Sequence, residues 1–229
     1  MKIALLGYGK MGHAIEALAP TRGHQVTLTI DNDDEWAAKG AQLKDCDIAI
    51  EFTQPDTAVG NIYRCFDAGI PVVVGTTGWY NQLQEVRERC KRQQQSLFYA
   101  SNFSIGMNIM FDLNRRLAQL MTSHDEYKVS ITETHHIHKL DAPSGTAITL
   151  ANDINAASGG ERMAIGDIKS VREGEVAGIH EVVYDSDIDT LSLCHSAKSR
   201  KGLAQGALLA AEYLANRRGV FTMEDLLKG

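Results

Sequence analysis

The stretch "KIALLGYGKMGHAIEAL", residues 2–18, decides the fold of this 229-residue chain. It begins with a short apolar run that suits a buried parallel strand, and it ends with apolar residues at helical spacing. Between the two lie Gly7, Gly9 and Gly12 in the pattern GxGxxG. A strand, a glycine-rich turn and a helix in this order predict the first unit of a Rossmann-like α/β sheet.

The three glycines have separate tasks in such a unit: a tight turn, room for a pyrophosphate against the backbone, and close packing of helix on sheet. The helix start adds free N–H groups and a partial positive charge, which favour phosphate. A plain tight turn is the alternative, but Asp31 ends the next predicted strand, where an acid can bind the adenosine ribose hydroxyls. We therefore expect dinucleotide binding, with contacts from Gly7, Tyr8, Gly9, Lys10, Met11, Gly12 and Asp31.

Strands and helices continue to alternate as far as about residue 104. Strands are predicted within 24–31, 46–53, 70–78 and 96–102, and helices within 13–23, 55–69 and 80–95. The alternation implies a parallel sheet covered on both faces, which binds ligands at the carboxyl ends of its strands. Two loops at that edge complete the expected cofactor contacts: Gly75, Thr76 and Thr77, and Ala100, Ser101, Asn102 and Phe103.

The pattern changes after residue 104. A helix is predicted over 104–121, and further helices over 144–157 and 204–219. Alternating apolar and polar residues in 127–136, 168–186 and 189–199 predict a mixed or antiparallel sheet with one face exposed or covered by a partner. The expected fold class is therefore α/β, a Rossmann-like parallel-sheet dinucleotide-binding domain with a second, smaller α+β domain.

Composition narrows the classes of partner and location. A net charge of −6 argues against nucleic acid as the main partner. No apolar run approaches the roughly 20 residues that span a bilayer, and the one at the N-terminus is too short for a signal peptide. The scattered cysteines, with no CxxC pair, indicate reduced thiols of a cytoplasmic protein: Cys46, Cys65, Cys90 and Cys194.

A second stretch, "ETHHIHKLDAPSGTA" at 133–147, crowds three histidines and a lysine ahead of a helix start. Three interpretations compete: a metal site, a polar strand end without chemistry, and an active site that handles protons and carboxylates. His135 and His136 point to opposite faces of a strand, and the sequence places no cysteine or carboxylate partner, so we expect no metal. A strand end whose histidines only form hydrogen bonds, without a chemical role, remains an open alternative.

The third interpretation draws on the residues that follow. Ser144 can cap a helix that starts at Gly145 or Thr146, and the free N–H groups of that start can bind a carboxylate. Lys139 adds a charge-assisted donor, and a histidine can deliver a proton near neutral pH. Together with a nicotinamide domain, these features predict a reductase of an acidic, unsaturated small molecule.

The second stretch closely resembles the signature E-x-H-H-x-x-K-x-D-A-P-S-G-T-A of the 4-hydroxy-tetrahydrodipicolinate reductase (dihydrodipicolinate reductase) family of lysine and diaminopimelate synthesis. The resemblance extends to "GYGKMG", "EFTQP", "VVVGTTG", "ASNFSIGMN", "VREGEVAGIHEV" and "SAKSRKGLAQGAL". It implies a domain that holds NADH or NADPH and a second domain that binds a small dicarboxylate substrate and builds a homotetramer. The last helix of that family returns to the nucleotide domain, so the expected domains are 1–104 plus 204–229, and 105–203.

The resemblance also implies roles by position. His135 matches the general acid and Lys139 a second proton-donating residue, whereas His138 matches no role. His136, Gly145 and Thr146 match the residues that hold the substrate's carboxylates, and Ser144 joins them as the helix cap. Two rivals share the glycine turn without needing the second stretch: another nicotinamide oxidoreductase, such as an amino-acid dehydrogenase, and a regulatory dinucleotide-binding protein without catalysis.

Overall fold

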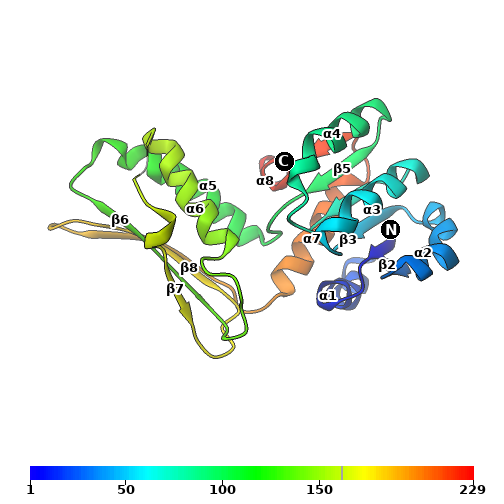
Figure 1. The fold of residues 1–229 in the computed structure, drawn as a ribbon, viewed down its shortest axis with the longest axis horizontal. Coiled ribbons are helices and arrows are strands. Elements are labelled where there is room, and N and C mark those ends of the chain that lie inside the picture. The colour runs from blue at the N-terminus through cyan, green and yellow to red at the C-terminus, as the bar shows by residue number, and fades with distance from the viewer. Residues whose placement is uncertain (161) are drawn as a thin grey trace. The chain divides into compact units, whose positions relative to one another are not determined.

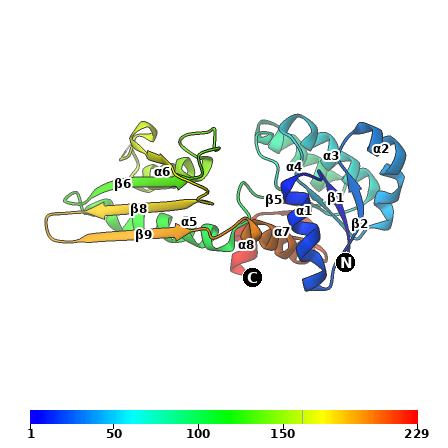
Figure 2. The same cartoon turned by 90° about the horizontal axis from the view of Figure 1, so that it is seen from below.

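The computed structural model, which describes residues 1–160 and 162–229, divides the chain into two units. Unit 1 comprises Met1–Ile105 and Lys201–Gly229, and unit 2 comprises Gly106–Arg200. The domain limits expected from the sequence, 104 and 204, lie one and three residues from these limits. The C-terminal segment thus returns to unit 1 (Figures 1 and 2).

Unit 1 contains a six-stranded parallel sheet in the order β10-β5-β4-β3-β1-β2. Its strands are β1 (Lys2–Leu6), β2 (Gln25–Ile30), β3 (Ile48–Glu51), β4 (Val72–Val74), β5 (Ser96–Tyr99) and β10 (Gly219–Phe221). The chain runs from β1 outward to β2 and then back across β1 to β3, so the strand order reverses between β1 and β3. Parallel α/β sheets bind their ligands in the crevice at such a reversal.

Helices cover both faces of this sheet, as the alternation predicts (Figure 1). One face packs against α3 (Pro55–Ala68) and α4 (Leu83–Arg92), and the other against α1 (Lys10–Leu18) and α7 (Lys201–Leu214). The central strands are buried on both sides, which explains their unbroken apolar sequence. Short 3₁₀ turns lie at Ala19–Arg22, Gly40–Asp45 and Tyr80–Gln82, and α8 (Met223–Lys228) ends the chain.

Three elements of unit 1 were not predicted from the sequence: helices α2 and α8 and strand β10. Helix α2 (Asp33–Lys39) buries none of its residues, so it has no apolar periodicity. It forms because Asn32 caps it by accepting a hydrogen bond from the Glu35 N–H at 3.0 Å, and three acidic residues lie in its first turn. Strand β10 has only three residues, and its pairing with β5 is what defines it.

Unit 2 contains a four-stranded mixed sheet in the order β7-β6-β8-β9, which agrees with the predicted type of sheet. Its strands are β6 (Lys128–His135), β7 (Lys169–Arg172), β8 (Ile179–Asp185) and β9 (Thr190–Ser196). Strand β7 is parallel to β6, and the other pairs are antiparallel. Short 3₁₀ turns lie at Met121–Ser123 and Ile165–Asp167.

Helices α5 (Ile105–Leu120) and α6 (Gly145–Ser158) cover one face of this second sheet (Figure 2). Alternate residues of β6 and β8, among them Ile131, Val182 and Tyr184, enter the core beneath the helices. The residues between them lie on the other face, which no helix of unit 2 covers in the described part. The alternation of apolar and polar residues in the sequence reflects this burial of one face of the sheet.

The helices and the cysteines of the structure can be compared with the expectations from composition. None of the helices in the described residues has the length and apolar character that crossing a membrane requires. All four cysteines are free, three of them buried and Cys194 exposed.

Gly206 provides a test of how α7 packs in unit 1. A Cβ atom at this position would lie 1.7 Å from the carbonyl oxygen of Phe103, whereas one at Gly202 in the same helix would meet nothing within 4 Å. Gly206→Ala should therefore destabilise the protein by about 1–3 kcal/mol, the usual range for overpacking. Gly202→Ala should leave the melting temperature unchanged or raise it slightly. Calorimetry of both variants checks this, and equal effects would contradict the packing described here.

Candidate functional site

The glycine turn after β1 has the geometry that a dinucleotide requires. Gly7 has φ +91°, and a Cβ atom there would lie 2.1 Å from the Phe52 carbonyl oxygen. A Cβ atom on Gly12 would lie 2.6 Å from the carbonyl oxygen of Gly7, so α1 packs closely on the turn. Gly9 caps α1 and faces open space. These are the three geometric tasks expected from the sequence, and the open space at Gly9 fits a phosphate at the start of α1.

Asp31 follows β2 and belongs to the same crevice. Its Oδ1 accepts a hydrogen bond from the Tyr8 N–H at 2.7 Å, which ties the end of β2 to the glycine turn. A cleft of about 690 Å³ opens here, lined by Gly9, Asp31, residues 52–54 after β3, and residues of α3. The volume of the cleft, the open space beside Gly9 and the carboxylate of Asp31 together fit a nucleotide.

The other two predicted cofactor loops contribute less through their side chains. Thr76 is buried, and its Oγ1 accepts a hydrogen bond from the Thr53 N–H at 2.8 Å. Ala100 is buried, and the Phe103 ring packs in the core beside Phe52. Thr77 and Ser101, in contrast, are exposed. Any cofactor contact from Thr76, Ala100 or Phe103 must therefore use the backbone.

One cation in this cleft was not assigned from the sequence. Arg64 of α3 lines it, with its guanidinium carbon 4.5 Å from the centre of the Trp36 ring and Nη2 3.6 Å from Asp33. Asp33 is 94% exposed, so this ion pair is loose. Lys39, by comparison, is tied to Glu35 at 3.1 Å. No spacing rule could have found Arg64, because only the packing of α3 beside α2 brings it near Asp31.

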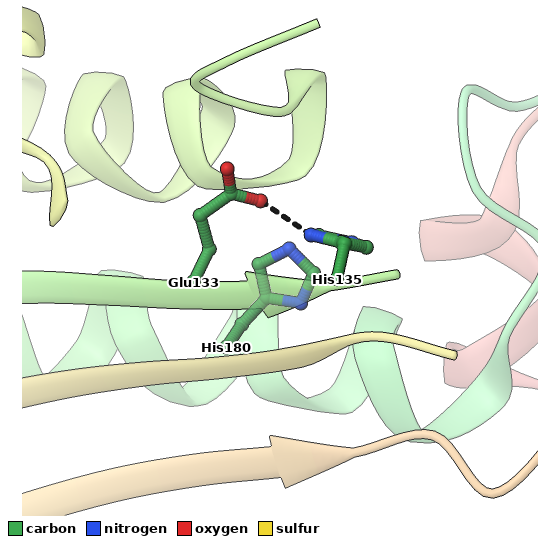
Figure 3. A group of neighbouring side chains, drawn as sticks. All are labelled: Glu133, His135 and His180. Carbon is green, nitrogen blue, oxygen red and sulfur yellow. Dashed lines mark ion pairs between the residues drawn. The ribbon is translucent and has the colours of Figure 1, made fainter. Parts of the chain in front are cut away.

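Unit 2 builds its polar centre on β6 and β8 (Figure 3). The Glu133 side chain is fully buried and lies opposite His180 in the strand register. His135 lies two residues further along β6, and its Nδ1 is 2.6 Å from Oε2 of Glu133. The His135 and His180 rings meet edge to face, with their centres 5.0 Å apart. Glu133, His180 and their contacts were not assigned from the sequence.

Arg172, at the end of β7, holds the Glu133 carboxylate from the other side. Its Nη2 donates to Oε1 of Glu133 at 2.9 Å and to the Asp141 carbonyl at 2.7 Å. Burial alone would raise the pKa of Glu133, but polar contacts with Ser170, Arg172 and Ser144 lower that pKa to about 2. The buried carboxylate is therefore ionised at neutral pH.

Burial acts in the opposite direction on the two buried histidines. It lowers the pKa of His135, an effect that the negative charge of Glu133 partly offsets. Burial and the neighbouring His135 lower the pKa of His180 to about 4. Both rings are therefore mainly neutral at pH 7 in the free protein.

Glu133, His135 and His180 offer three ligand atoms within 4.8 Å of one another, which raises the question of a metal. Tetrahedral zinc at about 2.0–2.1 Å from each ligand holds neighbouring ligand atoms about 3.3 Å apart. The contact of 2.6 Å between Glu133 and His135 is too short for that, and Arg172 already occupies the other carboxylate oxygen. The geometry favours a direct contact between Glu133 and His135 over a bound cation.

The start of α6 has the predicted cap. The helix begins at Gly145, and the Ser144 hydroxyl accepts a hydrogen bond from the Ala147 N–H at 3.2 Å. The same hydroxyl lies 3.1 Å from Nε2 of His180, so the buried Ser144 joins the helix start to the histidine pair. Gly145 is exposed with open space beside it, and Thr146 is half-buried. Ser144 is thus committed to structure, whereas the backbone at Gly145 is accessible to a ligand.

The loop between β6 and α6 carries the other predicted residues. Nζ of Lys139 lies 2.7 Å and 2.9 Å from the two oxygens of Asp141. Nε2 of His136 lies 3.4 Å from the guanidinium of Arg200, a second cation that was not assigned from the sequence. His138 forms an exposed pair with Glu175, which suits a residue without an assigned role.

The chain is similar along nearly its whole length to known proteins of one family. Two family models, "Dihydrodipicolinate reductase, N-terminus" and "Dihydrodipicolinate reductase, C-terminus", match residues 1–103 and 106–227. The 4-hydroxy-tetrahydrodipicolinate reductase of Christiangramia forsetii is 46% identical, with 99% of this chain and 98% of the relative covered. That of Staphylococcus aureus is 31% identical, with 99% of this chain and 100% of the relative covered.

Solved structures share the fold. Dipicolinate-bound dihydrodipicolinate reductase from Paenisporosarcina sp. TG-14 gives a TM-score of 0.79 at 21% identity, with 97% of each chain covered. Amine dehydrogenase from Mycobacterium smegmatis gives 0.64 at 11% identity, with 96% of this chain and 94% of that one covered. At these identities the likeness shows the fold alone.

The glycine turn, the acid after β2 and the second unit with its buried acid–histidine pair define a class, the two-domain dinucleotide-binding oxidoreductases. The fold alone does not distinguish the families within that class, because the amine dehydrogenase has the same fold. The relative at 46% identity and the two family models identify the family. The chain belongs to the dihydrodipicolinate reductase family of NAD(P)H-dependent oxidoreductases, as the resemblance implied.

Proposed function

We propose that the protein reduces 4-hydroxy-tetrahydrodipicolinate, by way of dihydrodipicolinate, to tetrahydrodipicolinate with NADH or NADPH, in the synthesis of diaminopimelate and lysine. One observation carries the proposal: the stretch 133–147 folds around a buried acid–histidine pair at a helix start, in a chain 46% identical to a named reductase. The rivals have no need of this arrangement. An amino-acid dehydrogenase or a regulatory nucleotide-binding protein would require only the glycine turn.

Unit 1 holds the cofactor in this proposal. The N–H groups at the start of α1 and the open backbone at Gly9 bind the pyrophosphate, and Asp31 accepts hydrogen bonds from the adenosine ribose. The remaining contacts come from residues 75–77 and 100–103. When bound, the reduced nicotinamide supplies a hydride.

Unit 2 holds the substrate through positive charge and backbone donors. The two carboxylates of the substrate bind His136, the Thr146 hydroxyl and the backbone N–H groups at the start of α6. Arg200, 3.4 Å from His136, adds a cation to this set. The site therefore suits a small dicarboxylate, and it would leave an uncharged analogue with these donors unsatisfied.

The chemistry accounts for the crowding of titratable groups. Loss of water from the cyclic substrate leaves a conjugated C=C–C=N system, and reduction at its carbon end moves negative charge toward the ring nitrogen. Lys139 stabilises that charge electrostatically, after its ammonium leaves Asp141. The imidazolium form of His135 supplies the proton that completes the reduction. We further propose that the enzyme is a cytoplasmic homotetramer, which the free cysteines and the uncovered face of the second sheet support.

We propose that both cofactors are used and that NADH is preferred. The Asp31 carboxylate suits the ribose hydroxyls of NADH and repels the 2′-phosphate of NADPH, with Asp33 close behind. Asn32, which follows Asp31, offers no charge for that phosphate. Arg64 offers a positive charge for the 2′-phosphate, because its loose pairing with Asp33 leaves the guanidinium able to turn toward a phosphate in the cleft.

The direct test of the proposed activity is NAD(P)H oxidation with the product of dihydrodipicolinate synthase as substrate. Turnover that depends on that product is expected. If the protein binds NADH but oxidises it only with an amino acid or keto acid, the dehydrogenase rival is correct. Binding without turnover on any substrate supports the regulatory alternative.

Replacing Lys139 tests the second proton-donating residue. Lys139→Ala should lower kcat by roughly 10²- to 10⁴-fold, the usual contribution of a positioned proton donor. Folding and NADH binding should survive, because the Lys139 ammonium bonds to Asp141 of its own loop. Lys169→Ala, an exposed lysine of the same unit, serves as the control. A kcat within a few-fold of wild type would remove Lys139 from the mechanism.

Thr146→Val separates substrate binding from cofactor binding. The variant removes a hydroxyl that should contact a substrate carboxylate, so KM should rise while the Kd for NADH stays constant. Thr149→Val, one turn further along α6, is the matched control, because its hydroxyl bonds back to the Gly145 carbonyl. Equal weakening of both ligands by Thr146→Val would mean that Thr146 supports the fold instead.

Cofactor preference tests the opposed roles of Asp31 and Arg64. Wild-type kcat/KM at low salt should favour NADH, and Asp31→Ala should raise the value for NADPH. Arg64→Ala should lower kcat/KM for NADPH by about 10- to 100-fold, as expected for a lost hydrogen bond between charged groups, and should spare NADH. Lys39→Ala is the control, since Glu35 already holds that lysine. A wild-type preference for NADPH, or no gain with Asp31→Ala, would contradict the role of Asp31.

A further inference from the structure

We propose that Glu133, held in place by Arg172, is a positioning residue for His135. It fixes the imidazole with hydrogen on Nδ1, so that Nε2 is the atom that gives and takes the catalytic proton. The inference rests on the proposed function, because it takes His135 as the proton donor. Neither Glu133 nor Arg172 would touch substrate or cofactor in this role.

The strand itself creates the pair. Glu133 and His135 are two residues apart on β6, so their side chains point to the same face of the sheet, beneath the start of α6 (Figure 3). Oε2 of Glu133 lies 2.6 Å from Nδ1 of His135, in direct contact although the ring is not aligned as in an ideal hydrogen bond. Both side chains are buried, so water does not compete for this contact.

The contact selects one tautomer of the neutral ring. A hydrogen on Nδ1 meets an ionised oxygen, which is favourable in a site of low polarity. The other tautomer would place the Nδ1 lone pair against the carboxylate, which is repulsive. The carboxylate therefore leaves Nε2 unprotonated in the neutral ring and stabilises the imidazolium once Nε2 gains a proton.

The side of the ring that carries Nε2 is bordered by a glycine. A Cβ atom on Gly178 would lie 3.1 Å from Nε2 of His135, closer than side chains normally approach. Gly178 also has φ +150°, which strains any other residue. A side chain at Gly178 would crowd Nε2, whereas the carboxylate contact at Nδ1 would be unaffected.

Arg172 makes Glu133 a fixed support. Its hydrogen bond of 2.9 Å to Oε1 leaves Oε2 directed at His135, and the Ser144 N–H donates to the same Oε1 at 3.3 Å. The guanidinium also binds the Asp141 carbonyl at 2.7 Å. Arg172 thereby fixes the support for His135 and the loop that carries Lys139 relative to each other.

The charges around His135 decide how its activity depends on pH. Glu133 faces it from β6, Lys139 from the following loop, Arg172 from β7 and His180 from β8, with His195 of β9 beyond His180. Of these, Glu133 alone raises the pKa of His135, while Lys139 and Arg172 lower it, as burial does. Glu133→Gln removes the raising influence, so the protonated acid is lost at a lower pH. The fall of kcat/KM on the alkaline side should shift to lower pH.

Glu133→Gln is the kinetic test because glutamine keeps the shape of the side chain. We expect kcat to fall by roughly 10²- to 10⁴-fold, the contribution of a positioned general acid. We also expect the fall of kcat/KM on the alkaline side to shift to lower pH. The Kd for NADH should not change. Glu175→Gln is the matched control: it alters the exposed pair with His138 in the same unit and should have no effect. A wild-type kcat and pH profile for Glu133→Gln would overturn the proposal.

A second measurement does not depend on how that variant folds. Ring ¹⁵N chemical shifts of the wild-type protein labelled at its eight histidines report each tautomer, and a His135→Asn variant assigns the signal. Hydrogen on Nδ1 of His135 at neutral pH is expected, and hydrogen on Nε2 would overturn the proposal. This result is independent of turnover, so a failure of the proposed activity with the expected tautomer would refute the proposed function and leave the positioning role of Glu133 standing.

Discussion

The polar centre of unit 2 depends on one buried carboxylate. Glu133 has no exposed surface, yet it stays ionised because Arg172 and the start of α6 donate to it and His135 touches it. A buried charge without such partners would be strongly destabilising, so these elements must meet in one arrangement. The start of α6, the end of β7 and strand β6 are thus held together by the hydrogen bonds and ion pairs that the buried Glu133 carboxylate requires.

Unit 1 depends on a different constraint, which is steric. At Gly7 the backbone passes so close to the Phe52 carbonyl that no side chain fits, and at Gly12 the helix touches the turn. These contacts draw the ends of β1 and β3 together at the reversal of strand order, where the cleft opens. Open space beside the start of α1 is therefore part of the fold itself, in a cleft that Asp31 and Arg64 also line.

Much of this could be predicted from local sequence because the decisive signals are local. Apolar runs that end in glycine, capping residues such as Ser144, and the alternation in β6 each describe a few consecutive residues and their burial. Helix α2 and strand β10 were missed for the same reason, since one buries nothing and the other consists of three residues paired with a distant strand. The stretch at 133–147 was found because its residues are contiguous.

The sequence by itself determined the fold class, the glycine turn, the helix start at Ser144 and the identity of the titratable residues between 133 and 146. Only the tertiary structure decided what surrounds them: Arg172 and His180 reach Glu133 from other strands, Arg200 reaches His136, and Arg64 enters the nucleotide cleft from α3. The physical reason is that a charge acts through space. Its partners are set by strand register and helix packing, which bring together residues that no spacing in the chain relates.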